Sequence, residues 1–141
     1  MRSAPWLLLV VVCLLPGIAD AQHPTVESTA TVRELHATMI KPASEVIFNV
    51  GREAPGTIET WSAIYNAGVT LTRSGNLLMT VSPPTDRARW ITLSRQLAAA
   101  GRAVRSTAEA RHLGRLMQTS DRLVIVCETC HARYRKQEPQ E

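Results

Sequence analysis

The chain has 141 residues, of which 45% are hydrophobic but only 4% aromatic, and its formal net charge is +4. This size excludes a multidomain protein and predicts one domain with one core. Because aromatic residues are so few, the core has to be built from leucine, valine, alanine and methionine, or be filled by another large apolar group.

Residues 1–21 have the pattern of an export signal. Arg2 supplies the positive charge, a short apolar run follows, and Ala19-Asp20-Ala21 supplies a cleavage site. The run is too short to anchor the mature protein in a bilayer. A lipid anchor at Cys13 is not expected either, because the residue before this cysteine is too bulky. We therefore expect residues 22–141 to be a soluble periplasmic domain with no stable membrane insertion.

Apolar residues at steps of three and four predict a first helix over about residues 28–50. Pro42 lacks an N–H group and should bend this helix. Residues 51–56 contain two glycines and a proline and should end it. The predicted core stripe is Val32, His36, Met39, Ala43, Val46 and Val50.

A second helix should follow and end at about Thr80. Glycine in a helix interior costs about 1 kcal/mol relative to alanine. Two glycines on the core stripe therefore suggest close approach of another backbone or of a flat ligand. This stripe is Trp61, Ile64, Gly68, Leu71, Gly75 and Leu78.

Two prolines in residues 82–85 predict a stop, and Asp86 is a candidate N-cap for a third helix. Ser106-Thr107-Ala108-Glu109 has the form of a capping box, so the turn into a fourth helix should lie between Arg105 and His112. The stripe of the third helix is Trp90, Leu93, Leu97, Ala100 and Val104.

The fourth helix should carry the two remaining cysteines on its core face. They continue the stripe that the leucines begin, so residues 123–126 should be helical although valine and isoleucine there favour a strand. Four helices joined by short turns predict an all-α, antiparallel four-helix bundle. The stripe is Leu113, Leu116, Ser120, Leu123, Cys127, Cys130 and Tyr134.

Cys127-Glu128-Thr129-Cys130-His131 matches the C-x-x-C-H pattern of covalent haem attachment. In this pattern the two thiols form thioethers with the haem vinyl groups, and the histidine is placed to bind the iron. Since a helix turns through about 100° per residue, Cys127, Cys130 and His131 should project from one face. We therefore predict one covalent haem c per chain, attached to the last helix and walled by the other three.

Two other kinds of site share part of this pattern. A thioredoxin-type dithiol would need further strands, and only eleven residues follow Cys130. A zinc site would need a fourth ligand, and the sequence offers no second C-x-x-C or H-x-x-x-H pair. The haem interpretation is therefore preferred.

Over residues 25–137 the chain resembles the class II c-type cytochromes, which are cytochrome c′ and its low-spin, six-coordinate relatives. The similarity is carried by the number of helices and by the late motif, which is followed by Ala132-Arg133-Tyr134-Arg135. It implies thioether bonds at Cys127 and Cys130, His131 as the proximal ligand, and Arg135 near the haem edge. The alternative role of Arg135 is a solvated cation at the helix end.

In this family the first helix supplies the residue over the open face of the haem. That residue is apolar in five-coordinate cytochrome c′ and a methionine in the low-spin carriers. This chain offers both His36 and Met39, which departs from either pattern, and each is a candidate iron ligand. The alternatives are a histidine hydrogen-bonded to a backbone group or a propionate, and a methionine that only fills the core.

The sequence thus predicts a periplasmic electron carrier. The alternative function is a five-coordinate module that binds NO or CO at the open iron position. We expect no enzymatic activity, because no distal acid–base pair with arginine can be placed for peroxidase chemistry.

The basic residues are concentrated in the part of the chain that carries the motif. Residues 86–141 hold eleven lysines and arginines against six acids. They form either a solvated helix face or a docking surface for an acidic redox partner protein. Nucleic acid is not expected outside the cytoplasm, and a homodimer is left open.

Overall fold

The computed structural model describes residues 31–81 and 86–135, and every element within them is helical. The predicted all-α class is therefore confirmed for this part of the chain. The predicted export signal at residues 1–21 and the stop at residues 82–85 lie outside it. The elements are α1 (Val32–Leu35), a π-helical turn (His36–Ile40), α2 (Lys41–Phe48), a 3₁₀ turn (Asn49–Gly51), α3 (Ile58–Thr80), α4 (Arg87–Glu109) and α5 (Leu113–Tyr134).

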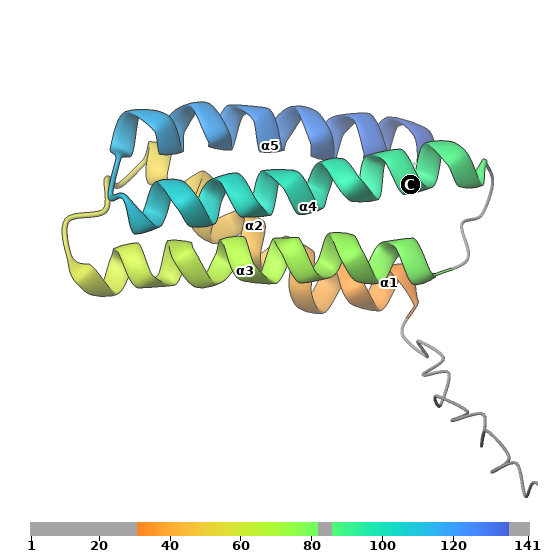
Figure 1. Cartoon of the computed structure of the whole chain (residues 1–141), viewed down its shortest axis with the longest axis horizontal. Coiled ribbons are helices and arrows are strands. Elements are labelled where there is room, and N and C mark those ends of the chain that lie inside the picture. The colour runs from red at the N-terminus through yellow and green to blue at the C-terminus, as the bar shows by residue number, and fades with distance from the viewer. Residues whose placement is uncertain (1–30, 82–85, 136–141) are drawn as a thin grey trace, which may run out of the picture.

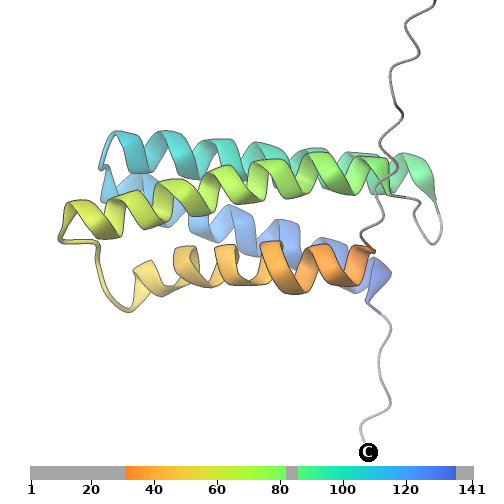
Figure 2. The ribbon, with the colours of Figure 1, turned by 90° about the horizontal axis from the view of Figure 1, so that it is seen from below.

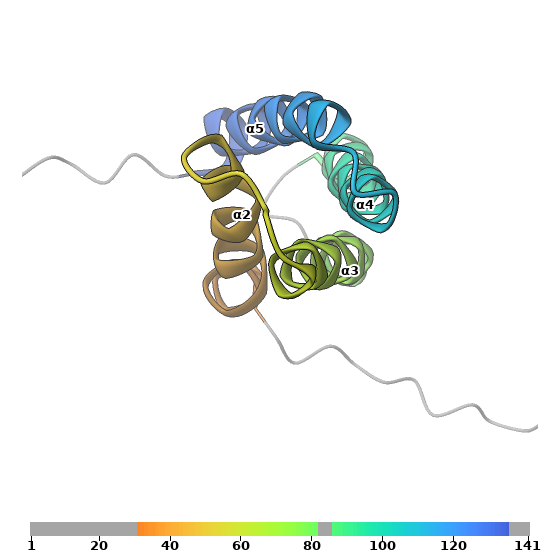
Figure 3. The ribbon, with the colours of Figure 1, turned by 90° about the vertical axis from the view of Figure 1, so that its left-hand side faces the viewer.

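The first four elements form one continuous rod, residues 32–51, called here the N-terminal segment. Figure 1 shows α3, α4 and α5 side by side along their length, with the end of α3 and the start of α4 at one end and the end of α4 and the start of α5 at the other. Seen end-on, the N-terminal segment, α3, α4 and α5 follow one another around a common centre (Figure 3). In Figure 2 α5 passes behind the N-terminal segment, and the two come together where the rings of His36 and His131 meet. No helix in residues 31–81 or 86–135 combines the length and apolarity needed to cross a membrane.

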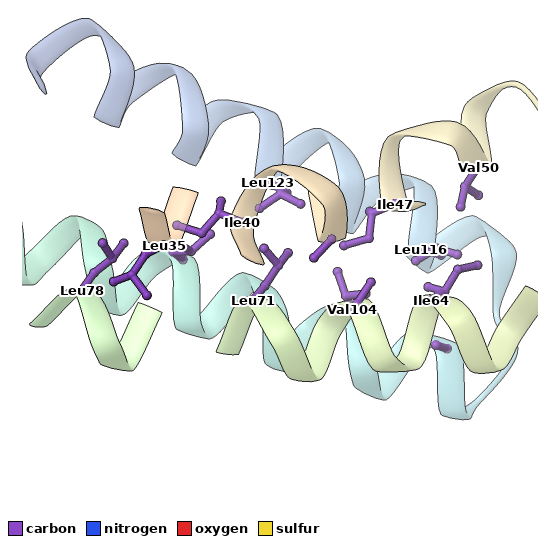
Figure 4. Packing of buried hydrophobic residues seen from close by; sticks show 14 of the residues in the cluster. Leu35, Ile40, Ile47, Val50, Ile64, Leu71, Leu78, Val104, Leu116 and Leu123 are labelled. Atoms are coloured by element: carbon purple, nitrogen blue, oxygen red, sulfur yellow. The ribbon is translucent and has the colours of Figure 1, made fainter. Parts of the chain in front are cut away.

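The core is one cluster of mainly aliphatic side chains to which every helix contributes (Figure 4). Trp90 is the only fully buried aromatic residue in the described part of the chain. The low aromatic content therefore leads to an aliphatic interior, as predicted. Its best buried members are Ile47, Leu71, Trp90, Val104, Leu116 and Leu123.

α3 and α4 pack with their backbones in direct contact at the glycines of α3. A Cβ atom on Gly75 would lie 2.6 Å from both the Ala98 nitrogen and the Ser94 carbonyl oxygen. A Cβ on Gly68 would lie 2.7 Å from the Arg105 nitrogen. Of the two explanations that the sequence allowed for these glycines, the structure selects approach of another backbone.

The start of α4 is fixed in the predicted way. The Asp86 side chain accepts a hydrogen bond from the Arg89 backbone nitrogen at 3.2 Å and so caps the helix. One turn later the buried Trp90 indole donates to the carbonyl oxygen of Leu78 at 2.6 Å. That carbonyl belongs to the last turn of α3, where intrahelical partners are missing, so Trp90 joins the two helix ends.

The predicted capping box at Ser106 does not begin a helix. α4 continues through it to Glu109, and the Thr107 hydroxyl donates back to the carbonyl oxygen of Ala103 at 3.0 Å. The turn comes after it, and the His112 imidazole caps α5 by accepting from the Arg115 nitrogen at 3.2 Å. The turn thus lies within the predicted interval, but a different residue forms the cap.

The N-terminal segment begins later than predicted and has a different core face. Thr31 and Glu34 form a reciprocal capping box, so the helix starts at Val32 and not near residue 28. Val46, predicted to be buried, is 37% exposed, whereas its neighbour Ile47 is fully buried. The observed core face is Leu35, Ile40, Ala43, Ile47 and Val50.

The cause of this difference is the π-helical turn. Leu35 and Ile40 are five residues apart, and in a regular α-helix they would point about 140° away from each other. In the π-turn the Lys41 nitrogen bonds to the carbonyl of His36, which inserts one extra residue and brings both side chains to the core. The sequence predicted an irregularity at Pro42, and the π-turn ends at Ile40, two residues before this proline, which lies in the first turn of α2.

Candidate haem-attachment site

The C-x-x-C-H residues lie on the inner face of the second half of α5. Cys127, Cys130 and His131 are all half-buried, and the helix runs unbroken through them from Leu113 to Tyr134. The predicted helical stripe is therefore confirmed over the motif. The thiols belong to free cysteines, and no strand occurs in residues 31–81 and 86–135.

Packing along α5 changes at Leu123. Its buried residues are Leu116, Thr119, Ser120 and Leu123, all in the first half of the helix. Figure 4 shows Leu116 and Leu123 among the core side chains. Beyond Leu123 the inner face is only partly covered by protein, although it remains apolar at Val126 and Tyr134. On α5 itself, the half of the helix that carries the motif is thus less buried than the half before it.

The N-terminal segment places a second histidine against the motif. The rings of His36 and His131 have their centroids 5.3 Å apart and are tilted by 56°. His36 is half-buried and is the first residue of the π-turn. Of the predicted ligands, the structure therefore brings His36 and His131 together.

Met39, the other predicted distal ligand, is also half-buried, but its side chain packs against the hydrophobic core. The ring of His36 instead lies beside that of His131. The two residues that share the predicted stripe thus have different neighbours.

Cations surround the histidine pair. Burial lowers the pKa of His36, and the charges of His131, Arg135 and Lys41 lower it further. Arg135 is the residue that ends α5, and its backbone nitrogen donates to the His131 carbonyl oxygen at 2.9 Å. Arg135 is exposed, so it lies close to the candidate site and in solvent, in agreement with both of its predicted roles.

Burial also acts on the two thiols. It raises the pKa of Cys127 to about 11, with smaller contributions from Cys130 and Glu128, and it raises the pKa of Cys130. Both sulfurs are therefore held as neutral thiols at physiological pH, in a setting that suits an apolar group better than a charged one.

The end of α5 is attached to the start of α4. The Tyr134 ring packs edge-on against Trp90 with centroids 5.1 Å apart. Arg133 reaches Asp86 at 3.6 Å, and the Tyr134 hydroxyl donates to the carbonyl oxygen of Asp86 at 3.4 Å. Sequence reasoning placed Tyr134 on the inner stripe but missed its partners, because no spacing rule links residues so far apart in the chain.

No family model, curated protein or solved structure matches this chain. In residues 31–81 and 86–135, no group of three or more His, Cys, Asp or Glu side chains is arranged to hold a metal ion. A haem is different in kind, because the porphyrin supplies four of the iron's ligands and the protein adds one or two.

The residues present fit a covalent haem. Two half-buried neutral thiols and an imidazole project from one helix face, and a second imidazole faces them from the neighbouring segment. The surrounding wall is apolar and incompletely packed beyond Leu123. Lys41 and Arg135 are the cations whose charges lower the pKa of His36, and cations of this kind would attract the propionate groups of a haem.

Proposed function

We propose that the mature chain is a periplasmic c-type cytochrome that carries single electrons, built as an antiparallel four-helix bundle with one haem on α5. The observation that supports it most is the C-x-x-C-H face, half-buried on a regular helix beyond Leu123, the last buried residue of α5. Export to an oxidising compartment, where c-type haem is attached, agrees with the signal pattern in residues 1–21.

Each residue of the motif has a separate task. Cys127 and Cys130 hold the cofactor through thioether bonds, and His131 ligates the iron from the α5 side. When bound, the haem supplies a reversible change between ferrous and ferric iron. The aliphatic core around Leu123 keeps water from the inner edge of the site.

The basic surface of α4 and α5 suggests how a partner would be recognised. These helices contain eight arginines against three acids. Among the described residues only Arg133 of these arginines lies within ion-pair distance of a carboxylate. The unpaired guanidinium groups favour encounter with an acidic redox protein, mainly through the association rate.

The test is production in cells able to attach c-type haem, followed by mass spectrometry of the exported protein. We expect one haem per chain on the peptide that contains residues 127–131, and loss of signal-peptide residues 1–21. The Cys127→Ser and Cys130→Ser double variant is the matched control and should carry no covalent haem. A colourless wild-type protein of unmodified mass would exclude the proposal.

A further inference from the structure

We propose that His36 is the second axial ligand of the iron, so that the haem is held between two histidines and has no open position. This inference depends on the haem-attachment function proposed above. It selects one of the two candidates that the sequence offers, and it opposes the alternative of a five-coordinate iron with an open position for NO or CO.

The first argument is the placement of the two rings. His131 follows the second motif cysteine. Its ring packs against that of His36, with 5.3 Å between the two centroids. If a nitrogen of each ring bound the same metal at about 2 Å, the two ring centroids would lie on the order of 1 Å farther apart than they do here. Both side chains are only half-buried, so rotation about their side-chain bonds can supply this change.

The second argument is the π-turn that presents His36. Leu35 before it and Ile40 after it are both buried in the core and fix the backbone on either side. The extra residue between these anchors turns His36 out of the core and toward α5. π-Turns interrupt α-helices most often at functional sites, where the irregular backbone aims a side chain.

The third argument is the different position of Met39. Its side chain is packed against the hydrophobic cluster, so binding to iron would remove apolar contacts that the core already makes. The half-buried His36 ring lies against the His131 ring instead, and a buried imidazole is stabilised by a polar or metal partner.

The chemical consequence is a closed coordination sphere. With nitrogen ligands on both faces, the iron changes oxidation state without gaining or losing a ligand, which suits electron transfer. NO or CO could bind only after His36 leaves the iron, so the fraction of molecules able to bind at any moment is small.

The experiment compares wild-type protein with His36→Ala and with the control Met39→Leu, all carrying covalent haem verified by mass. We expect low-spin spectra and slow CO binding for the wild type and for Met39→Leu. His36→Ala should become high-spin and bind CO about tenfold faster or more. Added imidazole should restore its low-spin spectrum by occupying the vacated position, and the unchanged spectrum of Met39→Leu is what distinguishes His36 from the other candidate ligand.

A second variant protects the test against misfolding. His36→Met should stay six-coordinate with a changed spectrum, because a thioether can replace the imidazole at the same backbone position. If His36→Ala keeps the wild-type spectrum, or if Met39→Leu alone loses it, His36 is not the ligand. Absence of covalent haem from the wild type would instead overturn the attachment proposal, so the two failures are distinct.

Discussion

A Cβ atom on Gly101 of α4 would lie 2.7 Å from the carbonyl oxygen of Gly68 in α3. It would also lie 2.5 Å from the Thr72 nitrogen. Neither neighbour is a flexible side-chain end, so no small adjustment relieves the contact. The two helices lie at this separation because both surfaces lack a side chain there.

Gly101→Ala should therefore destabilise the protein although alanine is the better helix former. We expect a loss of about 1–3 kcal/mol in the free energy of unfolding, measured with denaturant on the wild type and variant in the same haem state. Gly114→Ala in α5 is the control, because its Cβ would make only an ordinary contact at 3.6 Å with the His112 ring. That variant should be at least as stable as the wild type, and equal losses in both would contradict the packing argument.

Trp90→Phe should separate the two functions of the buried indole. Phenylalanine keeps most of the apolar contact with Tyr134 but cannot donate to Leu78, so that carbonyl loses its 2.6 Å hydrogen bond. We expect a loss of about 1–3 kcal/mol in unfolding free energy. The control is Trp61→Phe at a half-buried position, which should lose less stability. A larger loss for Trp61→Phe than for Trp90→Phe would show that the hydrogen bond is unimportant.

Ser44→Ala should increase stability. The Ser44 hydroxyl is buried and has no hydrogen-bond partner among the described residues. Removing it avoids an uncompensated desolvation penalty of about 1 kcal/mol. Ser94→Ala is the matched control, since the buried Ser94 hydroxyl donates to the Trp90 carbonyl oxygen at 2.9 Å. In thermal unfolding, the midpoint temperature of Ser44→Ala should be higher than that of the wild type, and that of Ser94→Ala should be equal to it or lower.

The thiols of haem-free protein should react slowly until the pH is high. Burial disfavours the Cys127 thiolate and raises its pKa to about 11, so at pH 8 far fewer molecules hold a reactive thiolate than in an unfolded chain. The alkylation rate of Cys127 should rise with pH up to about 11, whereas that of the urea-unfolded chain should level off near pH 9. Identical profiles would show that the thiol is not buried in the absence of haem.

The raised pKa of Cys127 also makes the stability of the haem-free protein depend on pH. A pKa that is higher in the folded state than in the unfolded state means that the neutral thiol stabilises the fold at pH values below the unfolded pKa. This contribution is lost as the pH rises to about 11, so haem-free protein should unfold more readily in that range. In protein with covalent haem neither thiol remains, and this pH dependence should be absent.

The helices could be predicted from sequence wherever the apolar spacing was regular. The stripe of α3, its two glycines and the Asp86 cap were correct because each depends on neighbours within one or two turns. The stripe of the N-terminal segment was correct at Ala43 and Val50 but wrong at Val46, and it missed Leu35, Ile40 and Ile47, because a spacing rule for α-helices has no place for a π-turn. The five-residue step from Leu35 to Ile40 was the available signal.

In the candidate site, too, the features set by local spacing could be predicted and those set by tertiary packing could not. The motif fixes which residues could hold a haem, and its location on one helix face follows from spacing alone. The contact between His36 and His131 joins residues almost a hundred positions apart, and only the packing of the N-terminal segment on α5 creates it. The Ser106 capping box failed for a related reason, since tertiary contacts of Ala108 extend α4 beyond it.

The glycine-mediated contact between α3 and α4 also bears on the order of assembly. These helices are consecutive in the chain, so they can form a hairpin without closing a long loop, and we expect this hairpin to form first during refolding. α5 would then dock onto an existing platform. The cysteines would therefore stay accessible in a partly organised intermediate, which gives the porphyrin time to be joined before the interior closes over it.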